Sequence, residues 1–527
     1  MNESVTGAAL IGASERQGGD SFTARNAATG QTLEPAFRES GADDVNAACE
    51  LAHATQAAFA DSSPMRRADF IEAVGAQVIA LGDALIDRAL LETGLPRARL
   101  ESERARTVGQ LGFMARRLRE GDCFDATIDR ALPARTPLPR PDLRRRHLAV
   151  GPVAVFGASN FPLAFSVAGG DTASAFAAGC PVVVKGHPAH PGTGELVARA
   201  IASAVRDAGF PEGVFSYLPG SGTALGAALV AHPHIRAVGF TGSRAAGLAL
   251  MRIAAARPEP IPVFAEMSSI NPVFLFPAAA ARRSGDLARA YVASLTLGAG
   301  QFCTNPGVLF GVAGADLESF IEVAAAALAA VPAQTMLTDG IATAYGRGVL
   351  QLQRVGGVEV VARGAADETL RRCRALLTRV DADRFLREPR LAEEVFGASS
   401  LIVRAASTDE FATLVENIEG QLTATVLYDP DDVPAVAKML PALERRVGRI
   451  IGNGWPTGVE VASAMVHGGP YPATSDGCST SVGSLAIQRF LRPVCYQDLA
   501  ETLLPSVLKD ANPWNVPRRV DDAMPLP

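Results

Sequence analysis

At 527 residues the chain is too long for one ordinary domain, and we expect two or three. Hydrophobic residues make up 48% of the chain and charged residues 20%, which is typical of a globular protein with a large core. The formal net charge of −6 gives no support for a nucleic-acid partner or for binding to an anionic membrane surface.

The cysteines and the N-terminus indicate a reducing compartment. Seven cysteines, odd in number and irregularly spaced, argue against a disulfide framework and against a CxxC metal site. Residues 1–14 lack the basic start and apolar core of a signal peptide, and no run of about 18 apolar residues predicts a transmembrane helix. We therefore expect a cytoplasmic protein.

The first 130 residues or so begin with short strand-like pieces and continue with helical periodicity over Asp43 to Ala60 and Met65 to Leu91. Residues 61–64, Asp-Ser-Ser-Pro, are a helix start signal for the second of these. Residues 133–150 are rich in proline and arginine and predict an extended hairpin that reaches outward. Its basic cluster, residues 144–146, indicates a solvated strand face or a subunit contact rather than a polyanion site.

From residue 151 short apolar runs alternate with helical segments. This pattern predicts a parallel, doubly wound sheet, with a ligand bound at the carboxyl ends of its strands. The runs are Val153 to Phe156, Pro181 to Val184, Val214 to Leu218 and Ala237 to Phe240. A second α/β region is expected from about 264 to about 465, followed by a tail with a late strand over Phe490 to Val494.

Cys303 lies in the small, polar, glycine-led segment Gly300-Gln301-Phe302-Cys303-Thr304-Asn305. A nucleophilic cysteine needs access and nearby hydrogen-bond donors, because the thiolate and not the thiol attacks. The sequence around it is equally compatible with one more buried thiol, which is what we expect of Cys49, Cys180 and Cys373.

Two further polar residues complete a possible reaction centre. Glu266 follows the strand-like run Pro262 to Ala265, although the commonest fate of a glutamate is a surface salt bridge. Asn160 follows the run Val153 to Phe156 and could equally be the turn residue of an Asn-Phe-Pro sequence. An amide donor, a carboxylate base and a thiol are the parts needed to oxidise an aldehyde through a thioester.

From about residue 10 to about residue 515 these motifs make the chain resemble the NAD(P)-dependent aldehyde dehydrogenases. Four segments are closer still to one subfamily, the 2,5-dioxovalerate (α-ketoglutaric semialdehyde) dehydrogenases. They are Glu92 to Pro96, Gly157 to Phe165, Glu266 to Pro272 and His467-Gly468-Gly469-Pro470-Tyr471-Pro472.

The resemblance implies a fold and an assembly. It implies a Rossmann-type cofactor domain over residues 1–132 and 151–263, and an α/β catalytic domain over 264–465. Residues 133–150 and 466–527 are then a small oligomerisation arm of strands with the C-terminal tail. A homodimer or homotetramer is expected.

The resemblance also implies the catalytic roles. Cys303 is the nucleophile, and Asn160 with the Cys303 backbone N–H binds the oxyanion. Glu266 is the general base for thioester hydrolysis, and we expect partial burial to raise its pKa to suit that task. The family usually has two glycines where this chain has Ser268 and Ser269.

For the cofactor, Lys185 matches the family lysine that reaches the adenosine ribose. Pro188 stands where many NAD-preferring relatives carry a glutamate that would repel a 2′-phosphate. Together with Lys185 and His187, its presence favours NADP, or use of both NADP and NAD. The other implied cofactor residues are Gly226, Thr241, Gly242, Ser243, Glu394 and Phe396.

Each of these cofactor positions has a stated task. Thr241-Gly242-Ser243 opens a helix and would hold the pyrophosphate on backbone N–H groups. Glu394 resembles the carboxylate that holds the nicotinamide ribose, with Phe396 beside the nicotinamide and Ala398 in place of the usual proline. His187 and His190 lie among prolines with no acidic partner, so we expect no metal site.

By its subfamily resemblance the substrate is 2,5-dioxopentanoate and the product 2-oxoglutarate, in the catabolism of sugar acids or hydroxyproline. A broad-specificity or fatty aldehyde dehydrogenase that uses NADP is the alternative within the class. A cysteine hydrolase or acyltransferase without a redox step would need a histidine base, and no histidine accompanies Cys303 in a recognised arrangement. A non-catalytic protein that kept the fold is the remaining alternative.

Overall fold

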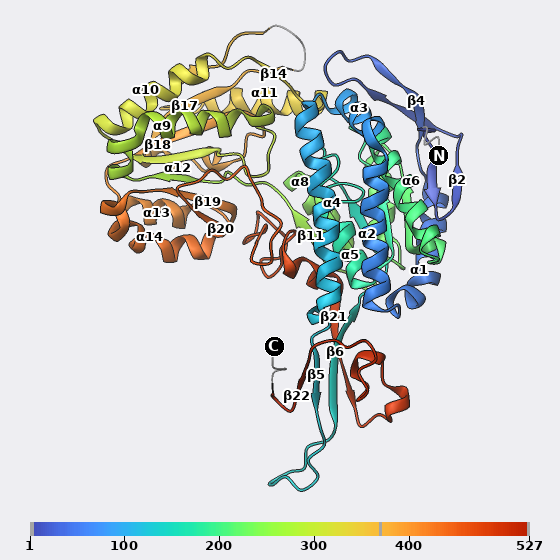
Figure 1. Ribbon diagram of the computed structural model, residues 1–527. Helices are drawn as coiled ribbons and strands as arrows, with labels where there is room; N and C mark the ends of the chain where they lie inside the picture. The colour runs from blue at the N-terminus through green and yellow to red at the C-terminus, as the bar shows by residue number, and fades with distance from the viewer. Residues whose placement is uncertain (1–4, 368–371, 524–527) are drawn as a thin grey trace.

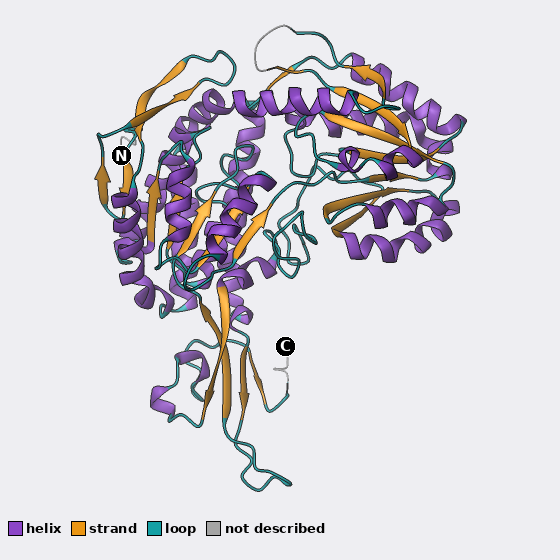
Figure 2. Cartoon of the chain, turned by 180° about the vertical axis from the view of Figure 1, so that it is seen from behind, coloured by secondary structure: helices purple, strands orange, loops and turns teal. Residues whose placement is uncertain are grey.

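The computed structural model describes residues 5–367 and 372–523. Two α/β lobes lie side by side, and a narrow arm built mainly from strands projects from the first lobe (Figure 1). Figure 2 shows the same arrangement from behind. Within the described residues no helix is long and apolar enough to cross a membrane.

The first lobe is built on a seven-stranded sheet in the order β11-β10-β7-β8-β9-β1-β2, in which the first five strands are parallel. Successive side chains of β7 and β8 alternate between two separate hydrophobic cores, one on each face. Both faces are therefore covered, as a doubly wound sheet requires. The strands are β1 (Ala9–Ile11), β2 (Ser14–Arg16), β7 (Val153–Phe156), β8 (Val182–Lys185), β9 (Phe215–Leu218), β10 (Ala237–Thr241) and β11 (Val263–Glu266), with a separate hairpin of β3 (Ser21–Arg25) and β4 (Thr32–Arg38).

Eight α-helices belong to this lobe among the described residues. They are α1 (Ala42–Ala60), α2 (Pro64–Ala80), α3 (Gly82–Thr93), α4 (Arg97–Glu120), α5 (Gly170–Ala178), α6 (Pro191–Asp207), α7 (Thr223–Ala231) and α8 (Arg244–Ala255). Ser63 caps α2 by accepting a hydrogen bond from the backbone N–H of Arg66, and Pro64 is its first residue, as the start signal predicts. The single helix expected over Met65 to Leu91 is wrong: it is two helices, because the chain turns at Gly82 with a φ of +55°.

The second lobe contains another seven-stranded sheet, in the order β15-β17-β18-β13-β12-β19-β20, parallel except for β15. Its strands are β12 (Val273–Leu275), β13 (Val308–Val312), β15 (Glu359–Arg363), β17 (Leu376–Asp381), β18 (Ser399–Ala405), β19 (Gln421–Leu427) and β20 (Val447–Gly452), with a short ladder of β14 (Gln334–Thr335) and β16 (Arg372–Cys373). Its helices are α9 (Pro277–Thr296), α10 (Ala315–Ala329), α11 (Asp339–Gln353), α12 (Ala382–Arg387), α13 (Asp409–Asn417) and α14 (Val433–Arg446).

The arm is a four-stranded sheet in the order β21-β6-β5-β22. Its strands are β5 (Ala126–Asp129), β6 (Leu143–Ala149), β21 (Leu491–Gln497) and β22 (Arg518–Val520). The arm sheet thus begins at Ala126, before the boundary of 133 expected from sequence, because β5 pairs with β6. Arg144, from the basic cluster, is buried and bonds Asp142 and Asp510 inside the arm.

Short 3-10 helices connect these elements: η1 (Asp122–Phe124), η2 (Glu212–Val214), η3 (Leu297–Gly300), η4 (Pro389–Ala392), η5 (Pro430–Asp432), η6 (Ser484–Phe490), η7 (Glu501–Leu503) and η8 (Ser506–Leu508).

The segment between β20 and η6 returns from the second lobe to the first. There the backbone N–H of Met267 donates to Ala473, and Thr474 forms a β-bridge with Glu266. This return brings a C-terminal loop against the end of β11.

Candidate active site

Cys303 lies in a loop that follows η3 and is fixed from two sides. Gly300 has a φ of +69°, and a Cβ atom there would lie 2.3 Å from the backbone nitrogen of Ala398, so only glycine fits. The Asn271 side-chain amide donates to the carbonyls of Cys303 and Asn305, at 2.9 Å each. Asn271 was not among the residues predicted from the sequence.

Glu266 is buried at the carboxyl end of β11, where two donors hold its carboxylate. One oxygen accepts from His467 Nε2 at 3.0 Å, and the other accepts from Ser481 Oγ at 3.0 Å. Burial by itself would raise the pKa of Glu266, but His467 and Ser481 more than offset it and hold the pKa below its ordinary value. The expectation of a raised pKa is therefore wrong, and Glu266 is a carboxylate at neutral pH.

His467 also faces the nucleophile, with Nε2 3.5 Å from Cys303 Sγ. The expectation that no histidine accompanies Cys303 is wrong. The two residues are 164 positions apart, so only the return of the chain to the first lobe brings them together. In the sequence the one available signal is the segment from His467 to Pro472, which carries part of the family resemblance.

The Cys303 thiol is neutral in the free enzyme. Burial raises its pKa well above the ordinary value, and the neighbouring carboxylate of Glu266 raises it further. Arg449, on β20, acts in the opposite direction. Because the thiolate is the reactive form, this cysteine needs a proton acceptor and a group that stabilises the sulfur anion.

Asn160 follows β7 and is brought to the Cys303 loop. Its side-chain amide donates to the carbonyl of Gln301 at 2.9 Å, which leaves the second amide hydrogen available. The ring of Phe161 packs edge-on against Phe302, with centroids 5.4 Å apart, and holds the two loops together. That Asn160 binds the oxyanion stays a prediction.

Ser268 and Ser269 replace two glycines without backbone strain, since neither has a positive φ. The Ser269 hydroxyl is bound within 2.9 Å of the side-chain oxygens of Asn271 and Gln421. It also accepts from the backbone N–H of Leu422 at 3.0 Å. The serine therefore adds polar contacts that fix the segment beneath the nucleophile loop.

Two arginines that were not predicted from the sequence act electrostatically on Cys303. Arg106, on α4, donates to the carbonyl of Val459, and its guanidinium stacks over Phe165 with a centroid distance of 5.3 Å. Arg449 donates to the carbonyls of Pro456 and Gly458 at 2.8 and 2.7 Å. The Arg106 atoms Nε and Nη2 and the Arg449 atom Nε are buried without a partner among the described residues.

Lys185 ends β8, and its ammonium donates to the carbonyl of Gly220 at 2.6 Å. Burial lowers the pKa of Lys185 to about 8, while the carboxylate of Glu39 acts to raise it. Glu39, which was not predicted from the sequence, accepts hydrogen bonds from Ser221 beside the same carbonyl. A cation and a carboxylate are thus both present where the adenosine ribose is expected.

His187 and Pro188 follow β8 in the same loop. Burial holds the pKa of His187 well below its ordinary value, so the ring is neutral and adds no positive charge for a phosphate. It stacks on His190 with centroids 5.2 Å apart. Within the described residues no acidic or thiol ligand joins this pair.

The segment from Thr241 to Ser243 lies between the end of β10 and the start of α8. Ser243 caps α8 by accepting from the backbone N–H of Ala246 at 3.3 Å, and the N–H of Gly242 donates to the carbonyl of Glu266 at 3.1 Å. Gly226, on α7, lies against Phe156 at the end of β7, where an added Cβ would come within 3.0 Å of the ring. These positions gather at the carboxyl ends of the parallel strands of the first sheet.

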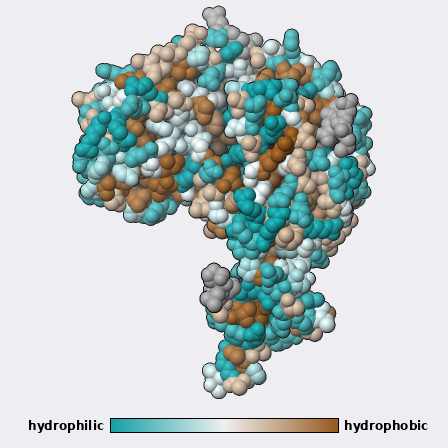
Figure 3. All heavy atoms as spheres, viewed as in Figure 1, coloured by the Kyte–Doolittle hydropathy of each residue, from teal (hydrophilic) through white to brown (hydrophobic). Residues whose placement is uncertain are grey.

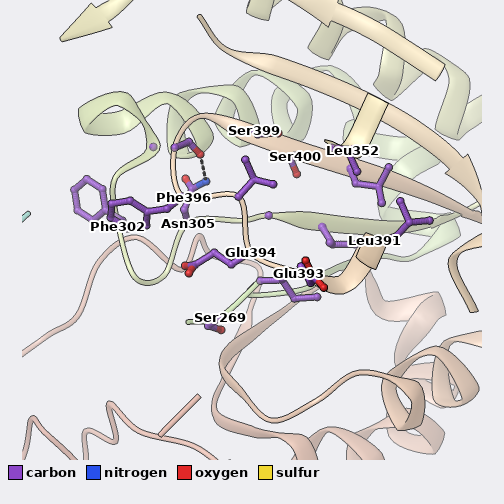
Figure 4. A pocket seen from close by; sticks show the side chains of 17 residues that line it. Ser269, Phe302, Asn305, Leu352, Leu391, Glu393, Glu394, Phe396, Ser399 and Ser400 are labelled. Carbon is purple, nitrogen blue, oxygen red and sulfur yellow. Dashed lines mark hydrogen bonds between the residues drawn. The ribbon is translucent and has the colours of Figure 1, made fainter. Parts of the chain in front are cut away.

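Glu394 and Phe396 line one pocket with Ser269, Gly300, Phe302 and Asn305 (Figure 4). Asn305 is anchored there by donating to the carbonyl of Gly397 at 3.1 Å. Burial raises the pKa of Glu394 to about 8, and a backbone hydrogen bond from Ser269 offsets this only in part. A half-buried carboxyl with so little support fits a site that takes hydroxyl donors from a ligand.

Comparisons with known proteins agree with this geometry. Residues 14–471 match the model of the aldehyde dehydrogenase family. The chain is 56% identical over 520 residues to alpha-ketoglutaric semialdehyde dehydrogenase 2 of Azospirillum brasilense, which covers 98% of this chain and 99% of that one. It is 46% identical over 492 residues to alpha-ketoglutaric semialdehyde dehydrogenase of Acinetobacter baylyi, with 93% of each chain covered.

The fold is shared with more distant solved structures. Apo betaine aldehyde dehydrogenase from Staphylococcus aureus superposes with a TM-score of 0.81 at 16% identity, over 94% of this chain and 96% of that one. Lactaldehyde dehydrogenase from Escherichia coli gives 0.80 at 20% identity, over 93% and 98%. With a matched family model over most of its length and two near-full-length relatives, this chain belongs to the aldehyde dehydrogenase family.

Proposed function

We propose that the enzyme oxidises 2,5-dioxopentanoate, the α-ketoglutaric semialdehyde, to 2-oxoglutarate. The main support is that relatives 56% and 46% identical over nearly the whole chain are named for this aldehyde. We further propose that it acts in the cytoplasm, in the bacterial catabolism of sugar acids or hydroxyproline; all seven cysteines are free, as a reducing compartment favours.

The chemistry follows from the side chains around Cys303. Its sulfur bonds to the aldehyde carbon, and the thiol proton leaves through Glu266. The amide of Asn160 and the backbone N–H of Cys303 stabilise the oxyanion, and each such donor contributes about 2.7–4 kcal/mol in the transition state. A nicotinamide cofactor, which Lys185 and Glu394 would hold, would supply the hydride acceptor. Glu266 then removes a proton from the water that hydrolyses the thioester, and the sulfur regains a proton as the carboxylate leaves.

The proposed substrate carries a carboxylate, and Arg106 is the residue we assign to it. Two of its guanidinium nitrogens are buried without a partner in the described chain, and it lies within electrostatic reach of Cys303. The neighbouring Arg99 is neutralised by Glu103 at 2.6 Å, whereas Arg106 makes no ion pair within the described residues.

Arg106→Gln is expected to raise KM for 2,5-dioxopentanoate roughly ten- to a hundredfold, because a charged hydrogen bond is lost. KM for hexanal, which has no carboxylate, should not change. Steady-state kinetics on both aldehydes measure this split, with Arg116→Gln on the same helix as the control for a lost surface charge. Equal effects on both aldehydes would remove Arg106 from the carboxylate site.

The same pair of aldehydes separates the alternatives. A broad-specificity or fatty aldehyde dehydrogenase would give hexanal the higher kcat/KM. A cysteine hydrolase without a redox step would produce no reduced cofactor with either aldehyde, and family membership already weighs against it. Absorbance of the reduced cofactor, followed with each aldehyde, gives the answer directly.

For the cofactor we propose use of both NADP and NAD. Pro188 puts an uncharged side chain where an NAD-selecting carboxylate would otherwise lie. Lys185 supplies a cation for a 2′-phosphate. Glu39 places a carboxylate close to Lys185, where it can accept from a ribose hydroxyl. The carboxyl of Glu394 would hold the nicotinamide ribose.

Pro188→Glu is expected to lower the NADP/NAD ratio of kcat/KM roughly ten- to a hundredfold, because a carboxylate repels the 2′-phosphate. Glu39→Gln is the matched opposite change and is expected to raise that ratio. Both ratios come from initial rates at saturating aldehyde. A folded Pro188→Glu enzyme with an unchanged ratio would place the ribose elsewhere than at the end of β8.

The arm supports our proposal that the enzyme is a homodimer or homotetramer. Strand β21 is an edge of the arm sheet, and an unpaired strand edge is a template for another chain. Apolar residues are visible on the arm surface (Figure 3), and Leu138 and Leu503 are each 69% exposed.

Removing the exposed tip of the arm, residues 131–139, is expected to reduce the oligomer to a smaller species, because the apolar contact is lost. Light scattering coupled to size exclusion reports the mass. An unchanged mass in a folded variant would show that subunits do not meet through this tip.

A further inference from the structure

A single N–H group of the described chain faces both the base and the nucleophile. His467 Nε2 lies 3.0 Å from a carboxylate oxygen of Glu266 and 3.5 Å from the Cys303 sulfur. Family membership accounts for the thiol and the carboxylate, but the histidine between them still lacks a task.

The hydrogen on Nε2 follows from its neighbours. Glu266 is a carboxylate, because its pKa is below the ordinary value, and so it can only accept a hydrogen bond. Nε2 must therefore carry a hydrogen, and this nitrogen cannot take the proton of the thiol. The same N–H is directed between the carboxylate and the sulfur, where it can donate to a sulfur anion.

The ring of His467 is also held in place. Its backbone N–H donates to Thr480 Oγ1 at 2.8 Å, and its carbonyl accepts from the N–H of Ser481 at 2.9 Å. Phe165 packs against the ring with centroids 6.0 Å apart. Only 2% of the residue is exposed, so water does not compete for the N–H.

We propose that His467 stabilises the Cys303 thiolate by donating its Nε2–H to the sulfur while Glu266 takes the thiol proton. The S–H bond breaks, the proton moves to the Glu266 carboxylate, and the negative charge moves from oxygen to sulfur. The N–H, shared at first between both acceptors, then serves mainly the sulfur. His467 itself neither gains nor loses a proton in this step.

The charged groups around the sulfur do not by themselves favour a thiolate. Glu266 on β11 opposes a negative sulfur, Glu394 in the second lobe opposes it once ionised, and Arg449 on β20 favours it. Arg106 on α4 also interacts electrostatically with this sulfur, but one of its nitrogens donates to the carbonyl of Val459. With the Glu266 carboxylate opposing the thiolate, a donor in direct contact with the sulfur has a clear task.

The test is the rate at which Cys303 is alkylated by iodoacetamide in the free enzyme, measured against pH with a chelator present. This readout needs no aldehyde, so it is independent of the proposed substrate. Two variants make a matched pair: Gln in His467→Gln places its amide N–H near the position of Nε2, whereas Asn in His467→Asn is too short to reach the sulfur. Mass spectrometry of the Cys303 peptide separates its alkylation from that of the exposed Cys478 and Cys495.

His467→Asn is expected to slow alkylation at neutral pH about tenfold or more and to move the midpoint of the profile upward by about one pH unit or more. His467→Gln should recover part of the rate. Ser479→Ala, in the same C-terminal loop, is the control, because its hydroxyl donates to the carbonyl of Asp476 and is bonded to neither Glu266 nor the sulfur; it should leave the alkylation profile in place. Identical profiles for His467→Asn and the wild type, or an equal shift in Ser479→Ala, would overturn the proposal, provided that cofactor binding shows the variants to be folded.

Discussion

Cys303→Ala is expected to abolish aldehyde oxidation while leaving cofactor affinity nearly intact. The thiol forms the covalent bond to the substrate, and its removal leaves no group that can form the thioester, so a loss of roughly 10⁴- to 10⁶-fold in kcat is expected. The contacts that we propose for the cofactor, at Lys185 and Glu394, do not involve the sulfur. Turnover and cofactor binding by fluorescence are the two measurements.

The exposed thiol of Cys495, on the arm, provides the control. Cys495→Ala should retain full activity, because that residue is remote from Glu266 and His467. Appreciable oxidation by the Cys303→Ala enzyme, beyond the contribution of residual wild-type protein, would end the assignment of the nucleophile.

Glu266→Gln is expected to separate the two halves of the reaction. Water attack on the thioester needs a base, and general-base catalysis contributes about 10²- to 10⁴-fold, so steady-state turnover should fall by that order. Hydride transfer should persist as a burst of reduced cofactor in the first turnover. Because Glu266 also accepts from the thiol, the burst is expected to be slower than in the wild type and to become faster as pH rises and the thiol ionises unaided.

Rapid-mixing absorbance at several pH values measures both phases. Ser481→Ala is a useful comparison, since it weakens the hold on the Glu266 carboxylate without removing the base. A burst that is absent at every pH, in a protein whose thiol still reacts with iodoacetamide, would show that Glu266 acts in hydride transfer and not only before and after it.

Much of the first lobe could be predicted because its strands are short apolar runs that end at turn residues. Strands β7, β8, β9 and β10 lie within about a residue of the expected segments, and their parallel order follows from the helices between them. Periodicity was less informative about helix breaks. It did not separate α2 from α3, since the apolar pattern continues across Gly82 and only the local φ reveals the turn.

The site was predictable only as far as each residue carried its own motif. Cys303, Glu266 and Asn160 each follow a recognisable local pattern. The structure places Asn160 against the loop of Cys303, and it places Glu266 against His467, which in turn contacts Cys303. His467 lies 201 residues from Glu266 along the chain, and no local pattern records that contact. The same holds for Arg106 and Glu39. Their roles depend on the positions of Cys303 and Lys185, which other segments of the chain supply.

The contacts around Cys303 have a mechanical consequence. The cysteine belongs to the second lobe, whereas Glu266, Asn160 and His467 are held by the first, so the sulfur-to-imidazole contact spans the junction between the lobes. A small sliding of one lobe against the other would lengthen that contact before any core side chain is exposed. The rate of Cys303 alkylation should therefore report the alignment of the lobes. Mild denaturant should slow this alkylation at concentrations where circular dichroism still records an intact fold.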